Sequence, residues 1–340
     1  MTVIPESGDK DGYYVPIIGN FIDNRYEILS LMGQGVYGNV VKVYDHKNGQ
    51  YYAMKISRKQ TCAEGLQELK ILRILMKEDK DGVKGSLRLV DRFEMNGHIV
   101  IVMELMDYTL HDMMFNPYLD QRYLARTFTK DVCSTLELLK KNHIIHGDLK
   151  PDNVMRKESG DEGQKGVFKL IDYGMSQFDD VGFEYYGHEY QCLTYRAPEV
   201  LLGREYGTEV DMWSLGCILA QLFYGEPWFS GIDEEDQVAR MMEVLGLPPP
   251  KMAIKSTRWN KFFSKTTGSP LYCESQIGQV NEIERPIRGA PGTCMVQVDF
   301  NDEEAKMALD FIFKCLKWDP EERMTPSQAL NHPYLTNIAL

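Results

Sequence analysis

His146-Gly147-Asp148-Leu149-Lys150-Pro151-Asp152-Asn153 is the most informative octet of the chain. It places a carboxylate, Asp148, five residues before an amide, Asn153, with the cation Lys150 between them. Phosphoryl transfer needs a carboxylate to meet the attacking hydroxyl, an oxygen ligand for a metal and a cation near the moving phosphate. The three side chains are the residue types for those three roles. A second acidic motif, Asp172-Tyr173-Gly174, begins nineteen residues after Asn153, and the two motifs together are far more specific than either alone.

Composition narrows the class of protein. A chain of 340 residues with 43% hydrophobic and 26% charged residues is typical of a globular protein with room for two lobes. The formal charge of −12 argues against a general nucleic-acid surface. No apolar run approaches the ~20 residues of a membrane span, and the N-terminus lacks a signal-peptide pattern. Seven cysteines without close pairing indicate reduced thiols. We therefore expect an intracellular protein, cytoplasmic or nuclear, that binds neither nucleic acid nor membrane.

Hydrophobic periodicity predicts two parts of different kind. Strand-like segments dominate up to about residue 103, and one helix interrupts them, with leucines every three residues from Leu66 to Leu75. After residue 103 the pattern becomes helical. Apolar residues at helical spacing from Leu124 to Leu139 indicate an amphipathic helix, and the nearly all-apolar run 210–223 indicates a buried helix. The predicted segments are an N-terminal extension 1–25, an N-terminal lobe 26–103, a hinge 104–107, a C-terminal lobe 108–336 and, within that lobe, a surface insertion at about 246–300.

Gly33-Gln34-Gly35-Val36-Tyr37-Gly38-Asn39-Val40 is a glycine-rich run of the pattern G-x-G-x-x-G-x-V. Glycines let a backbone approach phosphate oxygens closely. A lone run of this kind is weak evidence, because dinucleotide-binding folds carry a similar one in which the glycines open a helix. Here Val40, Val41 and Val43 continue as a strand, which favours a β-hairpin over phosphates.

Lys55 lies in Ala53-Met54-Lys55-Ile56, a strand-like stretch seventeen residues after Gly38. A buried lysine needs a partner or a ligand, because an unpaired buried charge is costly. Glu68, on the following helix, could be that partner while the ammonium binds phosphates. The alternative is a solubilising edge-strand lysine and a solvated glutamate. The glycine run before Lys55 and the octet after it favour the nucleotide role.

The glycine-rich run, Lys55, the octet and Asp172-Tyr173-Gly174 occur in the order of the eukaryotic protein-kinase signature set and resemble it. Ala197-Pro198-Glu199 matches a further motif of that set. The resemblance covers roughly residues 26–336. It implies an α+β, bilobal fold, with a small antiparallel β-sheet lobe carrying one helix and a larger, mainly helical lobe. It also implies that Glu199 pairs with Arg323 and that Asp211 braces the catalytic loop.

Further stretches resemble one branch of these kinases. Lys150 in Asp-Leu-Lys-Pro looks like the serine/threonine form, and Tyr195–Gly203 is similar to the proline-directed CMGC group of cyclin-dependent and mitogen-activated kinases. Four stretches resemble the dual-specificity tyrosine-phosphorylation-regulated kinase family. They are Arg25–Leu29, Val43–His46, Gln237–Glu243 and Leu271–Cys273.

The resemblance implies ATP and Mg²⁺ as cofactors and assigns the roles. Asp148 orients the acceptor hydroxyl and accepts its proton, and Lys150 neutralises the transferring phosphoryl group. Asp172 and Asn153 hold magnesium. Adenine is expected between the lobes, bonded to the backbone of Glu104 and Met106 with Met103 behind it, although Met103 alone would be read as core. The predicted ATP-binding residues are Gly33, Gln34, Gly35, Val36, Tyr37, Gly38, Val40, Ala53, Lys55, Met103, Glu104 and Met106, with Glu68 as partner of Lys55.

The implied substrate is a protein serine or threonine followed by proline, with Arg196 shaping the pocket beyond the acceptor and the kinase acting as a monomer. Asp152 could meet a substrate arginine or be a surface charge. One alternative is a catalytically weak pseudokinase acting as a signalling scaffold, but such proteins usually lose the equivalents of Lys55, Asp148 or Asp172. Another is a phosphotransferase for small molecules or lipids.

The activation segment, 172–199, departs from the family pattern. Gly147 replaces the arginine usual before the catalytic aspartate, which removes a cation for a phosphorylated loop. Tyr173 replaces phenylalanine and keeps an aromatic ring. The tyrosine that the family phosphorylates on itself would lie six residues before Tyr195, where this chain has Glu189.

Our hypothesis is that Glu189 supplies a permanent negative charge to Arg196, weaker than the roughly −2 of phosphotyrosine. The rival is Tyr190, which a slip in register would make the modified residue, and Tyr186 belongs to the same segment. Leu193 stands where the family carries a phosphate-binding arginine. A solvated loop glutamate remains a third interpretation of Glu189.

Overall fold

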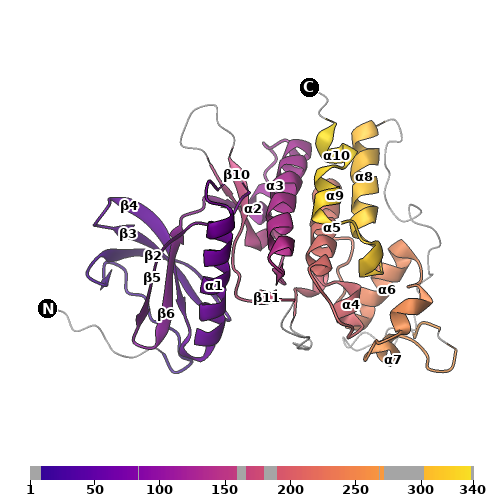
Figure 1. Cartoon of the computed structure of the whole chain (residues 1–340), viewed down its shortest axis with the longest axis horizontal. Helices are drawn as coiled ribbons and strands as arrows, with labels where there is room; N and C mark the ends of the chain where they lie inside the picture. The colour runs from indigo at the N-terminus through magenta and orange to yellow at the C-terminus, as the bar shows by residue number, and fades with distance from the viewer. Residues whose placement is uncertain are drawn as a thin grey trace. The chain divides into compact units, whose positions relative to one another are not determined.

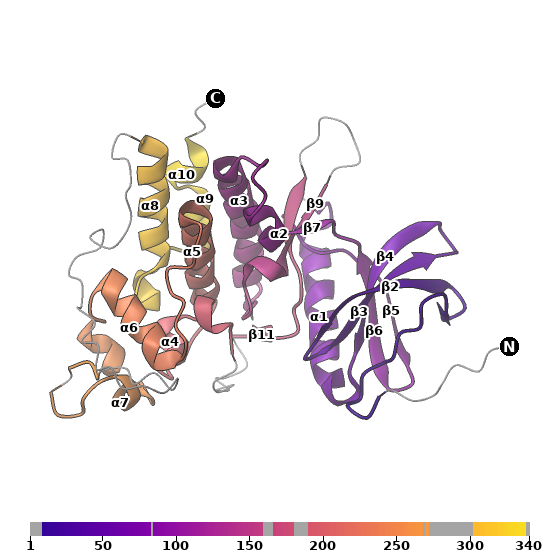
Figure 2. The same cartoon turned by 180° about the vertical axis from the view of Figure 1, so that it is seen from behind.

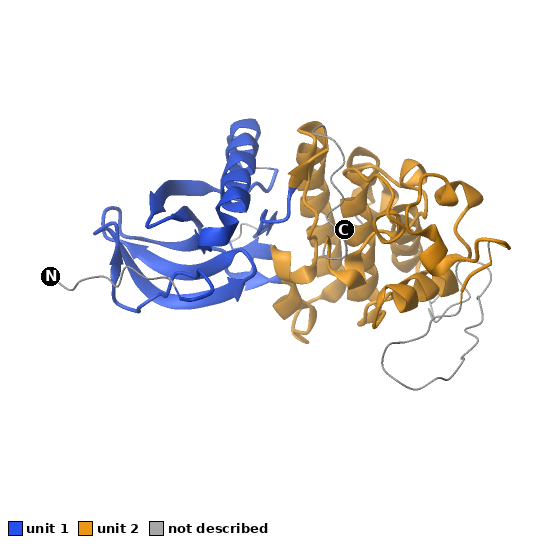
Figure 3. Cartoon of the chain, turned by 90° about the horizontal axis from the view of Figure 1, so that it is seen from below, with its two compact units in different colours: residues 1–109, 155–176 blue, residues 110–154, 177–340 orange. Residues whose placement is uncertain are grey.

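The computed structural model describes residues 9–82, 84–158, 166–179, 190–267, 269–271 and 302–337. The chain divides into two compact units (Figure 3). Unit 1 comprises Met1–Thr109 and Met155–Ser176, and unit 2 comprises Leu110–Val154 and Gln177–Leu340. The segment that follows the octet thus belongs to unit 1.

Unit 1 is built on a six-stranded sheet in the order β1-β2-β3-β4-β6-β5, with every neighbouring pair antiparallel (Figure 1). Alternate β-branched residues of the central strands, such as Val41 and Val43, are fully buried, as expected for a sheet with one face on a core. The strands are β1 (Phe21–Ile22), β2 (Tyr26–Gly35), β3 (Gly38–Asp45), β4 (Gln50–Ser57), β5 (Leu89–Met95) and β6 (His98–Glu104).

Helix α1 (Cys62–Glu78) packs against β5 and β6. Leu69, Leu72 and Leu75 are buried as the leucine pattern predicts, but Leu66 is 55% exposed. A helix advances about 100° per residue, so Leu66 and Leu75 lie on opposite sides of it. A period of three therefore drifts off the buried face, and Glu68 lies on that face instead, 2% exposed.

A three-stranded sheet of β7 (Tyr108–Thr109), β9 (Val154–Lys157) and β10 (Val167–Leu170) joins the segment after the octet to unit 1. Tyr108 pairs with Arg156 in antiparallel register, and the Asp107 amide donates to the Arg156 carbonyl at 3.1 Å. This pairing fixes β9, and β10, the next strand of the same sheet, leads into Asp172.

Unit 2 is mainly helical, and its long helices run side by side (Figures 1 and 2). Helix α3 begins where the Asp120 carboxylate accepts from two backbone amides, and α5 is buried nearly all round, as its apolar sequence predicts. The helices and strands of unit 2 are α2 (Leu110–Met114), α3 (Gln121–Lys141), β8 (Ile144–Ile145), β11 (Gln177–Phe178), α4 (Pro198–Leu201), α5 (Glu209–Tyr224), α6 (Glu234–Leu245), α7 (Trp259–Phe262), α8 (Glu303–Cys315), α9 (Pro326–Leu330) and α10 (Pro333–Thr336).

The predicted α+β fold, with an antiparallel sheet carrying one helix in one unit and mainly helices in the other, is confirmed. Among the described residues, no helix is long and apolar enough to cross a membrane. The five cysteines in the described ranges are free thiols.

Candidate active site

Lys55 on β4 lies between two carboxylates of unit 1. Its ammonium is 2.6 Å from Glu68 Oε2 and 2.6 Å from Asp172 Oδ1. Lys55 and Glu68 are buried, whereas the Asp172 side chain is 40% exposed. Burial alone would lower the pKa of Lys55, but the charges of Asp172 and Glu68 raise it above its ordinary value. Lys55 is therefore a fixed cation with one solvent-facing partner.

Asp172 has a backbone conformation that side-chain-bearing residues rarely adopt, with φ of 59°. Such strain costs of the order of 1–3 kcal/mol and is concentrated at functional sites. The amides of the next two residues hold the turn, because Tyr173 donates to Glu68 and Gly174 donates to Asp172, each at 3.3 Å. The carboxylate is thus aimed at Lys55 by local geometry.

The glycine-rich run forms the β2–β3 hairpin, as predicted, with Gly35 paired to Gly38. Gly38 has no room for a side chain, since a Cβ there would lie 2.9 Å from Ser57 Cα. Gly33, Gln34, Gly35 and Val36 are all exposed at the end of the hairpin. Tyr37 packs against Gly174, where a Cβ would lie 2.8 Å from the Tyr37 ring. The hairpin end therefore contacts the motif that carries Asp172.

The predicted adenine-site residues lie on adjacent strands. Ala53 faces Met103 across the β4–β6 pair, and both are buried. Val40 on β3 is half-buried opposite Lys55, and Met106 is 5% exposed. Glu104 is held separately, because its carboxylate accepts from Lys169 Nζ and from the Arg88 amide, each at 2.7 Å. The side chain of Glu104 is thus occupied, and only its backbone can serve a ligand.

The octet forms a bonded catalytic loop in unit 2. Asp148 is 9% exposed, and its Oδ2 atom accepts from Lys150 Nζ and from Asn153 Nδ2, each at 2.8 Å. Burial alone would lower the pKa of Lys150, but the hydrogen bond with Asp148 raises it above its ordinary value. With its amide nitrogen on Asp148, Asn153 can bind a cation only through its amide oxygen. Asp152 is exposed.

Asp211 of α5 lies directly under this loop. It accepts from the His146 amide at 2.7 Å and from the Gly147 amide at 3.0 Å, and it is 1% exposed. Burial raises the pKa of its carboxyl. The structure thus brings Asp211 to the backbone immediately before Asp148.

The sequence matches the family described as "Protein kinase domain" over residues 26–335. This is most of the chain, and it contains every group described above. The chain belongs to the protein kinase family.

Several relatives of this kinase are described as dual specificity tyrosine-phosphorylation-regulated kinases. Dual specificity tyrosine-phosphorylation-regulated kinase 3 of Homo sapiens is 37% identical over 342 residues, which cover 96% of this chain and 56% of the relative. The kinase mbk-2 of the same description from Caenorhabditis elegans is 37% identical over 341 residues, covering 96% and 40%. Dual specificity tyrosine-phosphorylation-regulated kinase 2 of Drosophila melanogaster is 37% identical over 333 residues, which cover 96% of this chain and 44% of the relative. The chain spans about half the length of these relatives, and the predicted resemblance is confirmed.

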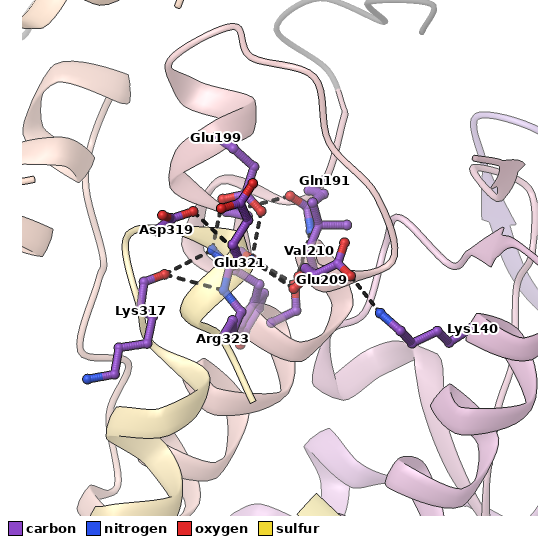
Figure 4. A network of polar contacts seen from close by, with 12 residues as sticks. Lys140, Gln191, Glu199, Glu209, Val210, Lys317, Asp319, Glu321 and Arg323 are labelled. Atoms are coloured by element: carbon purple, nitrogen blue, oxygen red, sulfur yellow. Dashed lines mark hydrogen bonds and ion pairs between the residues drawn. The ribbon is translucent and has the colours of Figure 1, made fainter. Parts of the chain in front are cut away.

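Glu199 and Arg323 form a bidentate ion pair in the interior of unit 2 of the kinase, with contacts of 2.7 and 2.9 Å (Figure 4). Neither side chain is exposed. Arg323 also donates to the carbonyls of Glu209 at 2.8 Å and Lys317 at 2.9 Å. These bonds join the end of the activation segment to α5 and to the segment after α8.

Arg196 is buried and donates in two directions. Its Nε and Nη2 atoms lie 3.3 and 2.8 Å from the carbonyl oxygen of Gln191, and Nη1 lies 3.0 Å from Glu234. Glu234 also accepts from Arg258 and from Lys261. Tyr186 and Glu189 lie outside the described residues, so the proposed contact between Glu189 and Arg196 stays a prediction.

Sequence reasoning missed several residues at this site. Gln191 has φ of 63°, and its side chain donates to Ser214 and accepts from the Ala197 amide. Nothing in the sequence marks this conformation, because glutamine has no preference for it. Glu234 could have been suspected as an acidic residue at the start of a helix, but its three cations come from distant positions.

Proposed function

We propose that this kinase transfers the γ-phosphoryl group of ATP to serine or threonine hydroxyls of proteins, at sites followed by proline. The observation that carries the proposal is the position of Lys55, 2.6 Å from both Glu68 and Asp172. In protein kinases, activity requires both this lysine–glutamate pair and the metal-binding aspartate in place. A scaffold that had lost catalysis would have no need to keep this strained, buried arrangement.

The residues have distinct roles in the proposed reaction. Lys55 binds the α- and β-phosphates and is held by Glu68. Asp148 meets the acceptor hydroxyl and takes its proton as the oxygen attacks the γ-phosphorus and the bond to the β-phosphate oxygen breaks. Lys150, bonded to Asp148, neutralises the charge of the moving phosphoryl group.

The oxygen donors fit magnesium. Asp172 offers a carboxylate that is partly exposed, and Asn153 offers an amide oxygen. Mg²⁺ prefers such hard oxygen ligands and takes the remaining ones from water and phosphates. When bound, the metal neutralises phosphate charge.

The bonds of Arg196 support a preference for proline after the acceptor. Two of its nitrogens donate to the Gln191 carbonyl, which uses both lone pairs of that oxygen. A substrate residue that passes this carbonyl would have an N–H without a partner there. Proline has no N–H and loses nothing.

The chemistry of the acceptor is a separate question, because dual specificity requires tyrosine as well. Tyr190 is 2% exposed, which makes it a poor acceptor in the described conformation. The acceptors that we propose on substrate proteins, serine and threonine, rest instead on Lys150 in Asp-Leu-Lys-Pro, which resembles the serine/threonine kinase form.

A radiolabelled ATP assay with magnesium tests the proposal. A peptide with serine before proline, the same peptide with alanine in place of proline, and a tyrosine peptide are offered side by side with a lipid and a sugar. We expect incorporation into the serine–proline peptide at least fivefold faster than into the others. ATP binding without transfer to any protein would favour the scaffold instead, and transfer only to the lipid or the sugar would favour a phosphotransferase for small molecules or lipids.

A further inference from the structure

Tyr190, at the end of the activation segment, is enclosed in unit 2. Its ring stacks on Tyr206, with centroids 4.9 Å apart and 21° between the planes. Gln177 donates to the Tyr206 hydroxyl at 3.0 Å. Gln177 belongs to β11, which pairs with Ile145 of β8, just before the catalytic loop. The ring of Tyr190 is thus joined through Tyr206 to Gln177, near the beginning of the activation segment.

Gly147 lies against the hydroxyl end of the Tyr190 ring. Its φ is 76°, and a Cβ at this position would overlap the Tyr190 hydroxyl oxygen and lie 2.6 Å from the ring carbon Cζ. The backbone cannot easily retreat, because the Gly147 amide is bonded to Asp211. Only glycine leaves space for the tyrosine, and the next residue is Asp148.

The same geometry argues against a phosphate on Tyr190. A phosphoryl group on its hydroxyl would enter a space that does not hold a methyl group at position 147. It would also bring a charge of about −1.5 to −2 close to the buried carboxylate of Asp211. Gly147 itself offers no cation to compensate.

We propose that Tyr190, unmodified, is a positioning residue for catalysis. Stacked on Tyr206 and in contact with Gly147, its ring holds the activation segment on the catalytic loop and keeps Asp148 in place, where other kinases use a phosphorylated residue. Gly147 is the matching half of this contact, because any side chain there displaces the ring. This inference rests on the proposed function, since it states what positions the catalytic loop of the same enzyme.

The test compares kinetics of the full chain with Tyr190→Ala, Tyr190→Phe, Gly147→Ala and the double variant Gly147→Ala/Tyr190→Ala. Tyr118→Ala is the matched control, because Tyr118 is 94% exposed. We expect Tyr190→Ala to lower kcat at least tenfold while KM for ATP stays within twofold, since Lys55 and its partners lie in unit 1. Tyr190→Phe should keep at least a third of kcat, because the ring remains.

The double variant measures the contact itself. Introduced into the wild type, Gly147→Ala should lower kcat at least tenfold. Introduced into Tyr190→Ala, where the ring is gone, the same substitution should lower kcat less than threefold relative to Tyr190→Ala alone. The inference would be overturned if the losses of the two single variants were additive, or if Tyr190→Ala kept the kcat of the wild type. It would also be overturned if Tyr190→Phe were inactive and the wild-type protein carried phosphate on Tyr190. Should Tyr190→Ala not fold, Tyr206→Ala replaces it with the same expectation.

Hydrogen exchange separates this inference from the proposed function. The His146 and Gly147 amides are both bonded to Asp211, and Tyr190→Ala should raise their exchange rates at least tenfold. A wild type that transfers no phosphate would refute the proposed function, and exchange would still decide the inference. Unchanged protection in Tyr190→Ala would overturn it.

Discussion

The guanidinium of Arg196 lies on the carbonyl oxygen of Gln191, with Nη2 at 2.8 Å, and Gln191 has φ of 63°. The left-handed conformation turns this carbonyl to the arginine, and Glu234 holds the arginine from its other side. A substrate N–H left without a partner costs about 1–3 kcal/mol. If the kinase is proline-directed as proposed, this cost corresponds to roughly a 5- to 150-fold preference for proline over other residues.

Arg196→Met should weaken this preference. Methionine has a similar length but no donors, so the Gln191 carbonyl becomes available to a substrate N–H, and Glu234 keeps Arg258 and Lys261. We expect the ratio of kcat/KM between serine–proline and serine–alanine peptides to fall about tenfold, mainly because the alanine peptide improves. Arg240→Met is the control, since Arg240 pairs with Asp236 on the same unit. An unchanged ratio would show that proline is selected elsewhere.

Lys55→Met should abolish most turnover. The substitution leaves Glu68 buried without its cation and removes the positive charge from the phosphates. Loss of a preorganised charge of this kind costs about 10²–10³-fold in kcat. Lys59→Met is the control, because Lys59 is exposed and lies two residues after the end of β4. Activity of Lys55→Met within tenfold of the wild type would contradict the role of Lys55.

The sequence located the parts of the site whose chemistry depends on spacing. Asp148 and Asn153 lie within one loop, and the glycine hairpin is local, so their residue types and order predict them. The buried face of α1, which carries Glu68, was harder to predict, because a leucine every three residues does not follow the helical period. The pattern put Leu66 with the buried leucines, although it is exposed.

Contacts between distant positions had no signal in the sequence. Tyr190 meets Gly147 across forty-three residues, and Glu234 collects cations from Arg196, Arg258 and Lys261. Charged residues make up 26% of the chain, so no spacing singles out which carboxylate pairs with which cation. Only the resemblance to known kinases predicted a pair of this kind, between Glu199 and Arg323.

Asp148→Asn should lower kcat about 10²–10⁴-fold, which is the range for loss of a general base. Asparagine keeps the size of the side chain but cannot accept the proton of the hydroxyl. KM for ATP should change little, since Lys55 and Glu68 lie in unit 1. Steady-state kinetics with the serine–proline peptide measure both constants. Asp112→Asn is the control in the same unit, because Asp112 lies on α2 and is exposed. Near-normal kcat in Asp148→Asn would show that this carboxylate does not serve as the base.

The buried cysteines should resist alkylation at pH 8. Burial raises the pKa of the Cys133, Cys217 and Cys315 thiols above the ordinary value, so almost none of each is thiolate at this pH. The thiolate is the reactive form. We expect iodoacetamide to leave these three residues unmodified in the folded kinase and to modify them in urea, as mass spectrometry of the peptides would show. Labelling of Cys217 at the rate of a free thiol would contradict the buried position of α5.

Arg323→Met should destabilise the kinase strongly. The substitution leaves the Glu199 carboxylate in the interior with no cation, and breaking a fully buried pair costs about 3–5 kcal/mol. Arg122→Met is the matched control, because Arg122 is 55% exposed and pairs with Asp302 at the surface, where such pairs contribute about 0–1 kcal/mol. Urea unfolding of both variants gives the two free energies. A loss below 1 kcal/mol for Arg323→Met would mean that Glu199 finds another partner, or a proton, when its arginine is removed.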